Sequence, residues 1–401
     1  MRAARAPASS AHAKSQVRKD PLSTIGRQLP LPIPVPDWSK PIILALLLLA
    51  LWLGVRSRVA ALRARRLEGQ RVTLLRDLGA MQTALVPDVP ASLGGLAVSV
   101  AYRPADGPAA GGDFYDVFEP SPGKVAIILG DVAGHGHEAL KHAALTRYTL
   151  RAYMHAGLEP KAALALAGEV LADPAREYYA TVATAVYDAS AGKLTYALAG
   201  HPHPILRGFQ TREPVNICVS PPIGWGVPTG RRQTTLSLPV GARVCFFSDG
   251  LIEARCAGEL LGRERLAEIV TALGARPTAA ALLERVRALT QGVPDDMAAC
   301  VFEPETAVDG ACTHVEELEV DARALAEIRI QRFLEACQVP RRELAHAVEL
   351  ARDIIATFGT AQLRIKIEPA GASVTVSPPP RATSRRRPQA TEQPLLQALS
   401  S

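Results

Sequence analysis

The hydrophobic pattern of the chain changes its period several times between residues 96 and 302. Short apolar runs have the character of β-strands, and two of them form a hairpin pattern that turns at 188–192. Longer segments repeat apolar residues at helical spacing. Strands are predicted at 96–102, 125–129, 180–188, 193–199, 243–247 and 297–302, and helices at 137–156, 160–172, 266–273 and 278–290. This mixture of hairpins and helix pairs favours an α+β fold in which sheet packs on sheet, over alternating βαβ units.

An uncharged apolar stretch of 14 residues runs from Ile42 to Val55. As a helix it would span about 21 Å, which is short of a hydrocarbon core of about 30 Å. Lysine, arginine and tryptophan side chains at its two ends can reach the membrane interfaces. We therefore predict a single transmembrane helix at 41–56. The alternative is a buried core helix.

Arginines are concentrated just after this stretch, whereas only Arg27 and Lys40 lie shortly before it. The positive-inside rule then places the C-terminal body in the cytoplasm, in a single-pass protein of the cytoplasmic membrane. Residues 1–40 are basic and rich in proline, which predicts a disordered segment. In residues 57–86, leucines at three- and four-residue spacing predict a linker helix. This helix either forms a homodimeric coiled coil or packs on its own domain.

The net charge of +6 is unevenly distributed along the chain. Residues 1–71 contain 13 Lys and Arg but 3 Asp and Glu, so they carry +10 and the remainder carries −4. A basic arm on a mildly acidic body predicts a membrane-proximal protein with no nucleic-acid partner. None of the six cysteines forms a C-x-x-C pair, and none has an arginine six residues later. The second absence excludes the C-x5-R loop of cysteine-dependent phosphatases.

Aspartates stand where predicted apolar strands begin or end. Asp131 and Asp249 each follow such a strand, and the pair Asp295 and Asp296 precedes one. Asp113 lies upstream, directly after two glycines. Carboxylates that rigid strands deliver to one edge of a sheet can hold hard divalent cations. The arrangement therefore predicts metal-assisted hydrolysis of a phosphate ester.

The order of these motifs resembles the metal-dependent protein phosphatases of the PPM (type 2C) family, in their bacterial SpoIIE/RsbU-like branch. The resemblance covers roughly residues 78–303, more than half of the chain. One departure is Ala298, which stands where the family has threonine in Asp-Asp-Met-Thr. The motifs that carry the resemblance lie at 111–117, 130–136, 179–188, 199–202, 222–224, 247–255, 258–266 and 295–297.

The resemblance implies a phosphatase domain at 87–304, built as an αββα sandwich of two packed antiparallel β-sheets flanked by helices. It also implies two bound Mn²⁺ or Mg²⁺ ions. Carried over residue by residue, the implied metal ligands are Asp113, Asp131, the carbonyl of Val132, Asp249 and either Asp295 or Asp296.

A water activated by the two ions would attack a phosphoryl group on serine or threonine of a regulatory protein. By resemblance, that partner is a STAS-type anti-anti-sigma factor. Asp131 and Asp249 are the implied catalytic carboxylates. His135 is a candidate for protonating the leaving oxygen, and the alternative is a supporting role for this histidine.

Other interpretations remain open at this stage. A pseudophosphatase that only binds its partner, or a membrane scaffold, would use the same chain without turnover, although the intact acidic positions favour an enzyme. The segment Gly111–Phe114 is similar to the GGDEF signature of diguanylate cyclases, but its acidic residues are not contiguous. The spacing of His201 and His203 suggests a zinc site, against which the flanking prolines favour a turn. Glu253 lies in a stretch that belongs to switching elements in this branch.

Residues 310–377 form a smaller predicted α/β module, with two helices followed by strands at 362–367 and 372–376. The module faintly resembles the opening of a GHKL-type anti-sigma kinase domain. It has Glu349 but no nearby asparagine and no glycine-rich lid, so we predict neither kinase activity nor ATP binding. Residues 378–401 are a predicted disordered tail.

Overall fold

The computed structural model describes most of the chain from residue 86 onward and a helical segment before it. The chain divides into two compact units, Met1–Arg76 and Asp77–Ser401. The predictions for 1–40, for the linker helix 57–86 and for the tail 378–401 fall almost entirely outside the described residues. The described residues are 38–39, 41–59, 62–63, 66, 86–105, 111–172, 178–209, 214–274, 278–290, 295–306, 313–368 and 371–379.

The first unit contains one long apolar helix, Pro41–Val59, of 19 residues. It is longer than the uncharged stretch because its last turn includes Arg56 and Arg58. The guanidinium of Arg56 lies 5.2 Å from the centre of the Trp52 ring. A helix of this length measures about 29 Å, close to a hydrocarbon thickness of about 30 Å. By length and composition it is able to cross a membrane.

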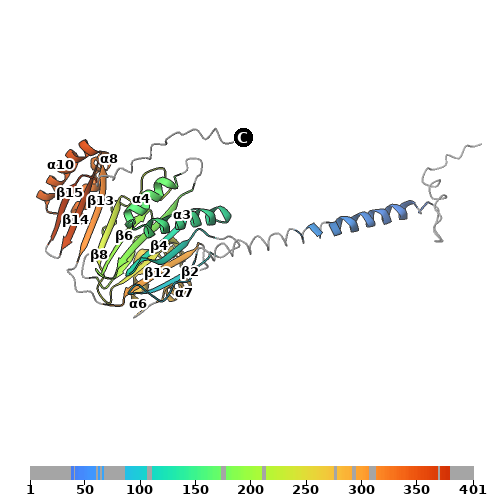
Figure 1. Cartoon of the computed structure of the whole chain (residues 1–401). Coiled ribbons are helices and arrows are strands. Elements are labelled where there is room, and N and C mark those ends of the chain that lie inside the picture. The colour runs from blue at the N-terminus through green and yellow to red at the C-terminus, as the bar shows by residue number, and fades with distance from the viewer. Residues whose placement is uncertain are drawn as a thin grey trace, which may run out of the picture. The chain divides into compact units, whose positions relative to one another are not determined.

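Two antiparallel sheets form the centre of the second unit (Figure 1). The five-stranded sheet has the order β1 (Ser92–Leu93), β2 (Leu96–Arg103), β12 (Met297–Pro304), β9 (Arg243–Phe247) and β7 (Ile205–Arg207). The eight-stranded sheet has the order β15 (Gly371–Ser377), β14 (Thr360–Glu368), β13 (His314–Asp321), β8 (Arg232–Ser237), β6 (Lys193–Ala199), β5 (Ala180–Asp188), β4 (Lys124–Val132) and β3 (Phe114–Ser121).

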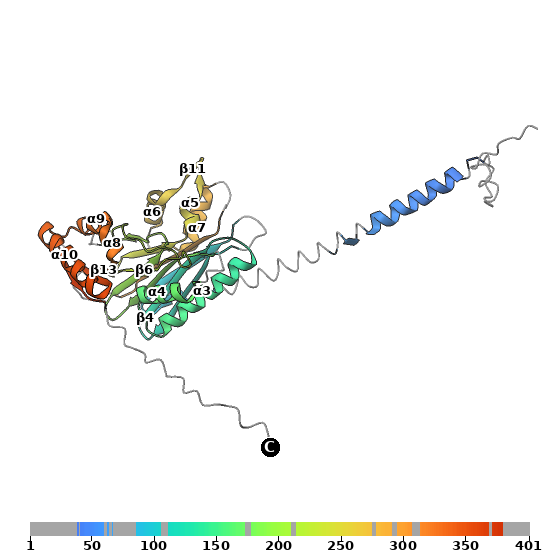
Figure 2. The ribbon, with the colours of Figure 1, turned by 90° about the horizontal axis from the view of Figure 1, so that it is seen from above.

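Helices cover the outer face of each sheet, as Figure 2 shows. On the eight-stranded sheet these are α3 (His137–His155) and α4 (Pro160–Val170), and on the five-stranded sheet they are α6 (Gly262–Ala272) and α7 (Ala279–Leu289). A short helix, α5 (Asp249–Glu253), follows β9, and a small hairpin of β10 (Arg255–Cys256) and β11 (Glu259–Leu260) follows α5. The order helix, sheet, sheet, helix confirms the predicted αββα sandwich.

The continuous apolar sequence of β4 is explained by burial on both of its faces. Ile128 packs toward α3 and α4, whereas Ile127 and Leu129 pack between the two sheets. In the same inter-sheet core, the rings of Phe246 and Phe302 stack at 6.0 Å. A strand buried on both faces reads as an unbroken apolar run, because neither face can carry polar residues.

All of the predicted strands and helices between 96 and 302 are present, with shifts of a few residues at their ends. Besides the short strands β1, β7, β10 and β11, the longer strands β3, β8 and β13 were not predicted. Each of these longer strands carries a buried polar or charged residue that breaks the apolar pattern, namely Asp116, Arg232 and Glu316. Sequence periodicity misses such strands because the residue that faces the interior is not hydrophobic.

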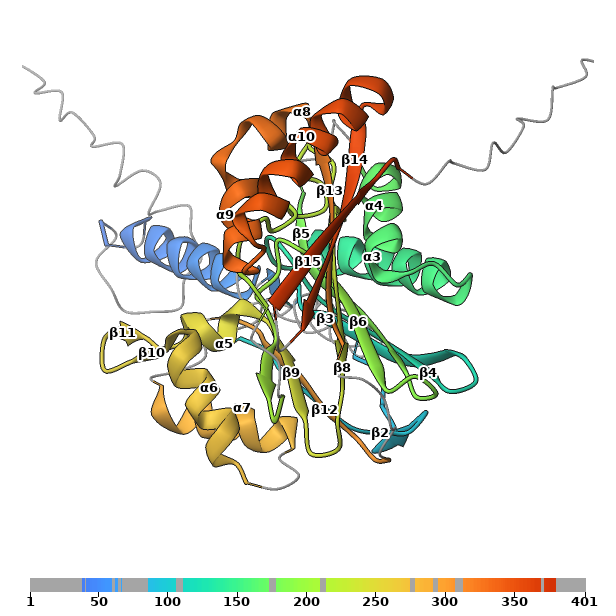
Figure 3. The same cartoon turned by 90° about the vertical axis from the view of Figure 1, so that its left-hand side faces the viewer.

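The C-terminal residues extend the eight-stranded sheet across the predicted domain boundary. The two predicted strands are present as β14 and β15, and β13 pairs with β8. Between β13 and β14 lie α8 (Ala322–Ala326), α9 (Ile328–Ala336) and α10 (Arg341–Phe358). Figure 3 shows these helices on one side of β13 and β14, with α3 and α4 on the other. The boundary between 304 and 310 stays a prediction, but the hydrogen-bonded sheet runs across it.

A buried ion pair joins β8 to β13. The Arg232 Nε atom lies 3.0 Å from Glu316 Oε2, and the two side chains are 6% and 0% exposed. Thr234 and His314 also bond the Glu316 carboxylate, and Arg232 stacks on Phe333 of α9 at 4.8 Å. Burial acts to raise the pKa of Glu316, but the Arg232 charge and these hydrogen bonds lower it below its ordinary value. Both side chains are therefore charged inside the protein, and each charge is offset by the other.

Breaking this ion pair should destabilise the protein strongly. We expect Glu316→Ala to lower the free energy of unfolding by about 3–5 kcal/mol, because it leaves the Arg232 charge buried without its partner. The double variant Arg232→Met/Glu316→Leu should recover most of the loss, since it removes both charges together. Urea unfolding of the full-length protein in detergent measures both values.

The matched control is Arg323→Ala, whose side chain is 88% exposed. It should change the free energy of unfolding by less than about 0.5 kcal/mol. Equal losses in Glu316→Ala and in this control would contradict the role given to the buried pair.

Candidate active site

Asp131 stands near the end of β4, at the edge where the sheet meets a glycine-rich loop. The segment before β3 passes directly over this point: Val132 N donates a hydrogen bond to Gly112 O at 3.2 Å. A Cβ atom on Gly112 would lie 2.1 Å from the Val132 carbonyl oxygen, and one on Gly111 would lie 1.6 Å from Asp296 Oδ2. Only glycine permits this close approach. The two glycines therefore bring Asp113 to the end of β4.

Asp113 is almost completely buried, at 2% exposure. Its Oδ2 atom has no hydrogen-bond partner within the described part of the chain. Burial raises the pKa of the Asp113 carboxyl well above its ordinary value, and the charges of Asp131 and Asp296 raise it further. A buried acidic oxygen without a donor is costly unless a counter-charge compensates it.

Asp249 is the first residue of α5 and follows β9 after Ser248. Ser248 fixes this point to the neighbouring strand β12: Ser248 N donates to Ala298 O at 3.0 Å, and Ala298 N donates to Ser248 Oγ at 2.9 Å. Burial raises the pKa of Asp249, and the charges of Glu253 and Asp295 add to this effect. The two hydrogen bonds hold the Asp249 end of β9 beside the Asp295 end of β12.

Asp295 and Asp296 precede β12 and differ in their surroundings. Asp295 is exposed, whereas Asp296 is 3% exposed. The oxygens of Asp296 accept hydrogen bonds from Tyr102 Oη at 2.7 Å and from Ala105 N at 2.8 Å. Asp296 thus ties the strand β2 to the site, while Asp295 faces solvent.

The geometry places these carboxylates in one region: a Cβ atom on Gly112, next to Asp113, would lie 2.9 Å from Asp131 Oδ1, and one on Gly250, next to Asp249, would lie 1.9 Å from the Asp296 carbonyl oxygen. Burial raises the pKa of Asp131 to about 7, and the charges of Asp249, Asp295 and Asp296 contribute to the shift. Burial also raises the pKa of Asp296, against the hydrogen bond from Tyr102. The predicted convergence of acidic residues from distant parts of the sequence is therefore present in the fold.

The carboxylates do not form a closed cage. Across the described residues, no three His, Cys, Asp or Glu side chains are arranged as a preformed metal-binding group. The donor set nonetheless fits hard divalent cations: all the donors are oxygens, and they include a buried oxygen of Asp113 with no hydrogen-bond partner among the described residues.

His135 lies in the loop after β4, four residues beyond Asp131, and is exposed. It lines an open depression of about 420 Å³ together with Gly134, Glu138, Lys141 and Tyr178. The depression begins at the loop that follows Asp131. A histidine there is able to exchange protons with a bound group while remaining in contact with solvent.

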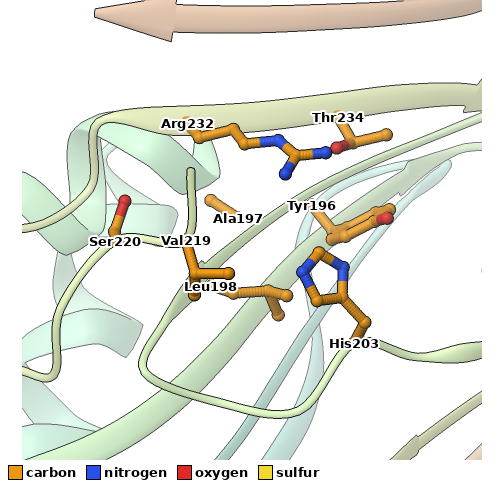
Figure 4. Close-up of a pocket in the computed structure, with 8 residues that line it drawn as sticks. All are labelled: Tyr196, Ala197, Leu198, His203, Val219, Ser220, Arg232 and Thr234. Atoms are coloured by element: carbon orange, nitrogen blue, oxygen red, sulfur yellow. The ribbon is translucent and has the colours of Figure 1, made fainter. Parts of the chain in front are cut away.

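Three other polar residues are buried or half-buried and make contacts within the fold. Asp116 is buried and bonds Arg147 and Arg151 of α3, so it fixes α3 to the sheet. His201 is buried against Thr181, at 3.1 Å from its hydroxyl. His203 lines a separate small cavity with Tyr196, Arg232 and Thr234 (Figure 4). Burial lowers the pKa of His201 to about 3 and that of His203 to about 4.

The structure adds supporting residues that sequence reasoning did not place in the site. The bonds from Tyr102 and Ala105 to Asp296 depend on the pairing of β2 with β12. Ser248 precedes Asp249 directly, yet its partner lies 50 residues later in the sequence, at Ala298. Such long-range contacts cannot be derived from local spacing.

Comparisons with known proteins agree with this architecture. Residues 121–305 match the family model described as Stage II sporulation protein E (SpoIIE). The match includes Asp131, Asp249 and Asp295, and it begins after Asp113.

Among solved structures, the SiaA PP2C domain of Pseudomonas aeruginosa aligns with a TM-score of 0.50 and 21% identity, over 60% of this chain and 98% of that one. The RsbU and RsbW domains of Rv1364c from Mycobacterium tuberculosis align with a TM-score of 0.45 and 22% identity, over 70% and 84% of the two chains. The PP2C phosphatase domain with a regulatory fragment of SpoIIE from Bacillus subtilis aligns with a TM-score of 0.45 and 22% identity, over 52% and 63%.

The family match and the two-sheet fold point to the same class of protein. Residues 121–305 match a model of the SpoIIE family, and the two-sheet fold agrees with that of the SiaA PP2C domain.

Proposed function

We propose that this protein is a metal-dependent serine/threonine phosphatase that acts on a phosphorylated regulatory protein. The observation that carries the proposal is the gathering of acidic residues at neighbouring strand ends, where Gly111 and Gly112 bring the segment of Asp113 against Asp296 and the Val132 carbonyl. The substrate class follows from the resemblance, which indicates a STAS-type anti-anti-sigma factor.

The residues proposed to hold two Mn²⁺ or Mg²⁺ ions are Asp113, Asp131, the carbonyl of Val132, Asp249 and Asp295. We favour Asp295 over Asp296, because hydrogen bonds from Tyr102 and Ala105 already engage the Asp296 carboxylate. When bound, such ions would lower the pKa of a water molecule and offset the negative charge of the phosphoryl oxygens.

The chain itself supplies the positioning and the proton transfer. The Ser248–Ala298 bonds set Asp249 beside Asp295, and Asp296 holds β2 against the site. We propose that His135, which lines the open depression, donates a proton to the leaving serine or threonine oxygen; the alternative is a supporting role. Ala298 is buried within β12, so the threonine that it replaces is not required for the backbone arrangement.

The second candidate is a pseudophosphatase that binds a phosphoprotein without hydrolysing it. The exposed position of His135 suits binding as well as turnover. Titration calorimetry with Mn²⁺ separates the two functions, because a binding module has no need to take up the ion. Heat of Mn²⁺ binding that is lost in Asp131→Asn supports the enzyme.

We also propose that the protein is anchored in the cytoplasmic membrane by the helix Pro41–Val59, with its C-terminal unit in the cytoplasm. The arginines after the apolar stretch support this orientation. Residues 57–86 are proposed to form a homodimeric linker.

Removing a metal-binding carboxylate should abolish turnover. We expect Asp131→Asn and Asp249→Asn to lower the rate of Mn²⁺-dependent hydrolysis of p-nitrophenyl phosphate and of a phosphoserine protein at least about 100-fold, since even residues behind metal ligands commonly cost 10- to 100-fold. The control Asp353→Asn changes an exposed carboxylate of α10 and should leave the rate unchanged. Wild-type rates in either active-site variant would refute the metal assignment.

The same carboxylates predict a pH-dependent stability in the presence of EDTA. The folded protein holds the Asp131 proton with a pKa of about 7, above the ordinary value of about 3.9. Protonated Asp131 therefore stabilises the folded state. This contribution to the free energy of unfolding is fully present below about pH 4 and is lost as the pH rises through 7. We expect the melting temperature of the wild type to fall between pH 5 and pH 8. In Asp131→Asn the fall over the same range should be about 5 °C smaller.

Differential scanning calorimetry of the full-length protein in detergent measures both melting temperatures. Asp353→Asn serves again as the control and should follow the wild type. An identical pH dependence in the wild type and Asp131→Asn would show that Asp131 carries no excess negative charge.

Membrane anchoring is tested by fractionation. We expect the full-length protein to stay with the membranes after an alkaline carbonate wash, and a variant lacking residues 41–59 to move to the soluble fraction, because only the former contains an apolar helix of spanning length. Protease added to intact right-side-out vesicles, in which the cytoplasmic face is enclosed, should leave the C-terminal unit uncleaved. Cleavage of that unit in intact vesicles would reverse the proposed orientation.

A further inference from the structure

Two large aromatic side chains are exposed close to the candidate active site. Tyr179 is 41% exposed and Trp225 is 57% exposed. Their rings meet edge to face, with centroids 5.0 Å apart. Val227, two residues further along, is 47% exposed. Tyrosine and tryptophan are the residues that most often dominate the energetics of protein–protein interfaces.

The backbone around Trp225 is shaped to present this side chain. Gly224 and Gly226, on either side, have left-handed φ values of +85° and +76°. A Cβ atom on Gly224 would lie 2.3 Å from the Tyr178 carbonyl oxygen, so no other residue fits there. The turn is attached to the eight-stranded sheet by two hydrogen bonds of 3.0 Å between Ile223 and Ala180. The aromatic pair is therefore held on rigid backbone.

The pair is connected directly to the loop of the catalytic carboxylate. Ala133 N donates a hydrogen bond to Tyr179 O at 3.0 Å, and Val132 pairs with Ala180 in the β4–β5 ladder. The open depression beside this loop extends from Gly134 to Tyr178, the residue next to Tyr179. The loop after Asp131 thus borders the depression through Gly134 and His135, and it bonds the backbone of Tyr179 through Ala133.

We propose that Tyr179 and Trp225 form a docking surface for the folded body of the phosphoprotein substrate, while its phosphorylated segment lies in the depression. This inference rests on the proposed phosphatase function. Continuity with the candidate active site favours the substrate over a membrane or a second copy of this chain. A small phosphate ester has no folded body that could contact the aromatic pair. The surface should therefore contribute to the affinity for a folded protein and not to hydrolysis itself.

The test compares three substrates with full-length protein in detergent: a phosphorylated STAS-domain protein, a phosphopeptide that covers its phosphorylated residue, and p-nitrophenyl phosphate. We expect Trp225→Ala and Tyr179→Ala each to raise KM for the phosphoprotein about tenfold, with kcat within twofold of the wild type. The rate with p-nitrophenyl phosphate should stay within twofold, which also shows that the variants fold.

Trp225→Phe keeps an aromatic ring and should restore most of the affinity for the phosphoprotein. The control Val240→Ala removes an equally exposed apolar side chain from the turn between β8 and β9, and should have no effect on any substrate. This turn precedes β9, whereas Asp249 follows it, so Val240 lies at the opposite end of the strand.

Several results would overturn the inference. An unchanged KM for the phosphoprotein in both alanine variants removes the docking surface. So does an equal loss for all three substrates, because the aromatic pair would then support the site itself. Reduced flotation with anionic liposomes, or reduced dimerisation, at an unchanged KM assigns the surface to a membrane or to a second copy. Absence of hydrolysis by the wild-type protein refutes the proposed function and, with it, this inference.

Discussion

The burial of several carboxylates in one region is the constraint on which the rest of the structure depends. Asp113, Asp131, Asp249 and Asp296 are partly or fully withdrawn from water, and burial raises the pKa of each of them. An arrangement of this kind costs free energy in the folded protein and has to be held by the surrounding fold. The two hydrogen-bonded sheets provide that support, because their strands cannot shift without breaking many backbone bonds at once.

The support acts through particular short contacts between segments that are distant in sequence. Ser248 exchanges two hydrogen bonds with Ala298, which aligns the ends of β9 and β12. Gly112 allows the segment before β3 to touch the Val132 carbonyl. The family threonine is absent at Ala298, but the backbone bonds that fix this position do not need its side chain. A change of the site residues alone would therefore leave the scaffold intact, whereas a change of Gly112 would displace Asp113.

The sequence predicts an element well where a single physical requirement, such as burial on both faces, selects a single type of residue. Strands buried on both faces, such as β4 and β9, are unbroken apolar runs. The aspartates at their ends are predicted as site residues by their position alone. Strands whose inward positions are polar were missed, because Arg232 on β8 and Glu316 on β13 compensate each other only after the two strands pair. The partners of Asp296 were missed for the same reason: Tyr102 reaches it from a strand 194 residues away.

The C-terminal segment lies outside the family match but inside the folded unit. The family match ends at residue 305, but β13 continues the hydrogen-bonded ladder from β8. A chain cut at 305 would expose β8 as an open edge and would leave Arg232 without Glu316 and without the ring of Phe333. Open edges and unpaired buried charges are both strongly unfavourable. The segment 313–377 is therefore required to complete the sandwich, whatever signal or partner it also serves.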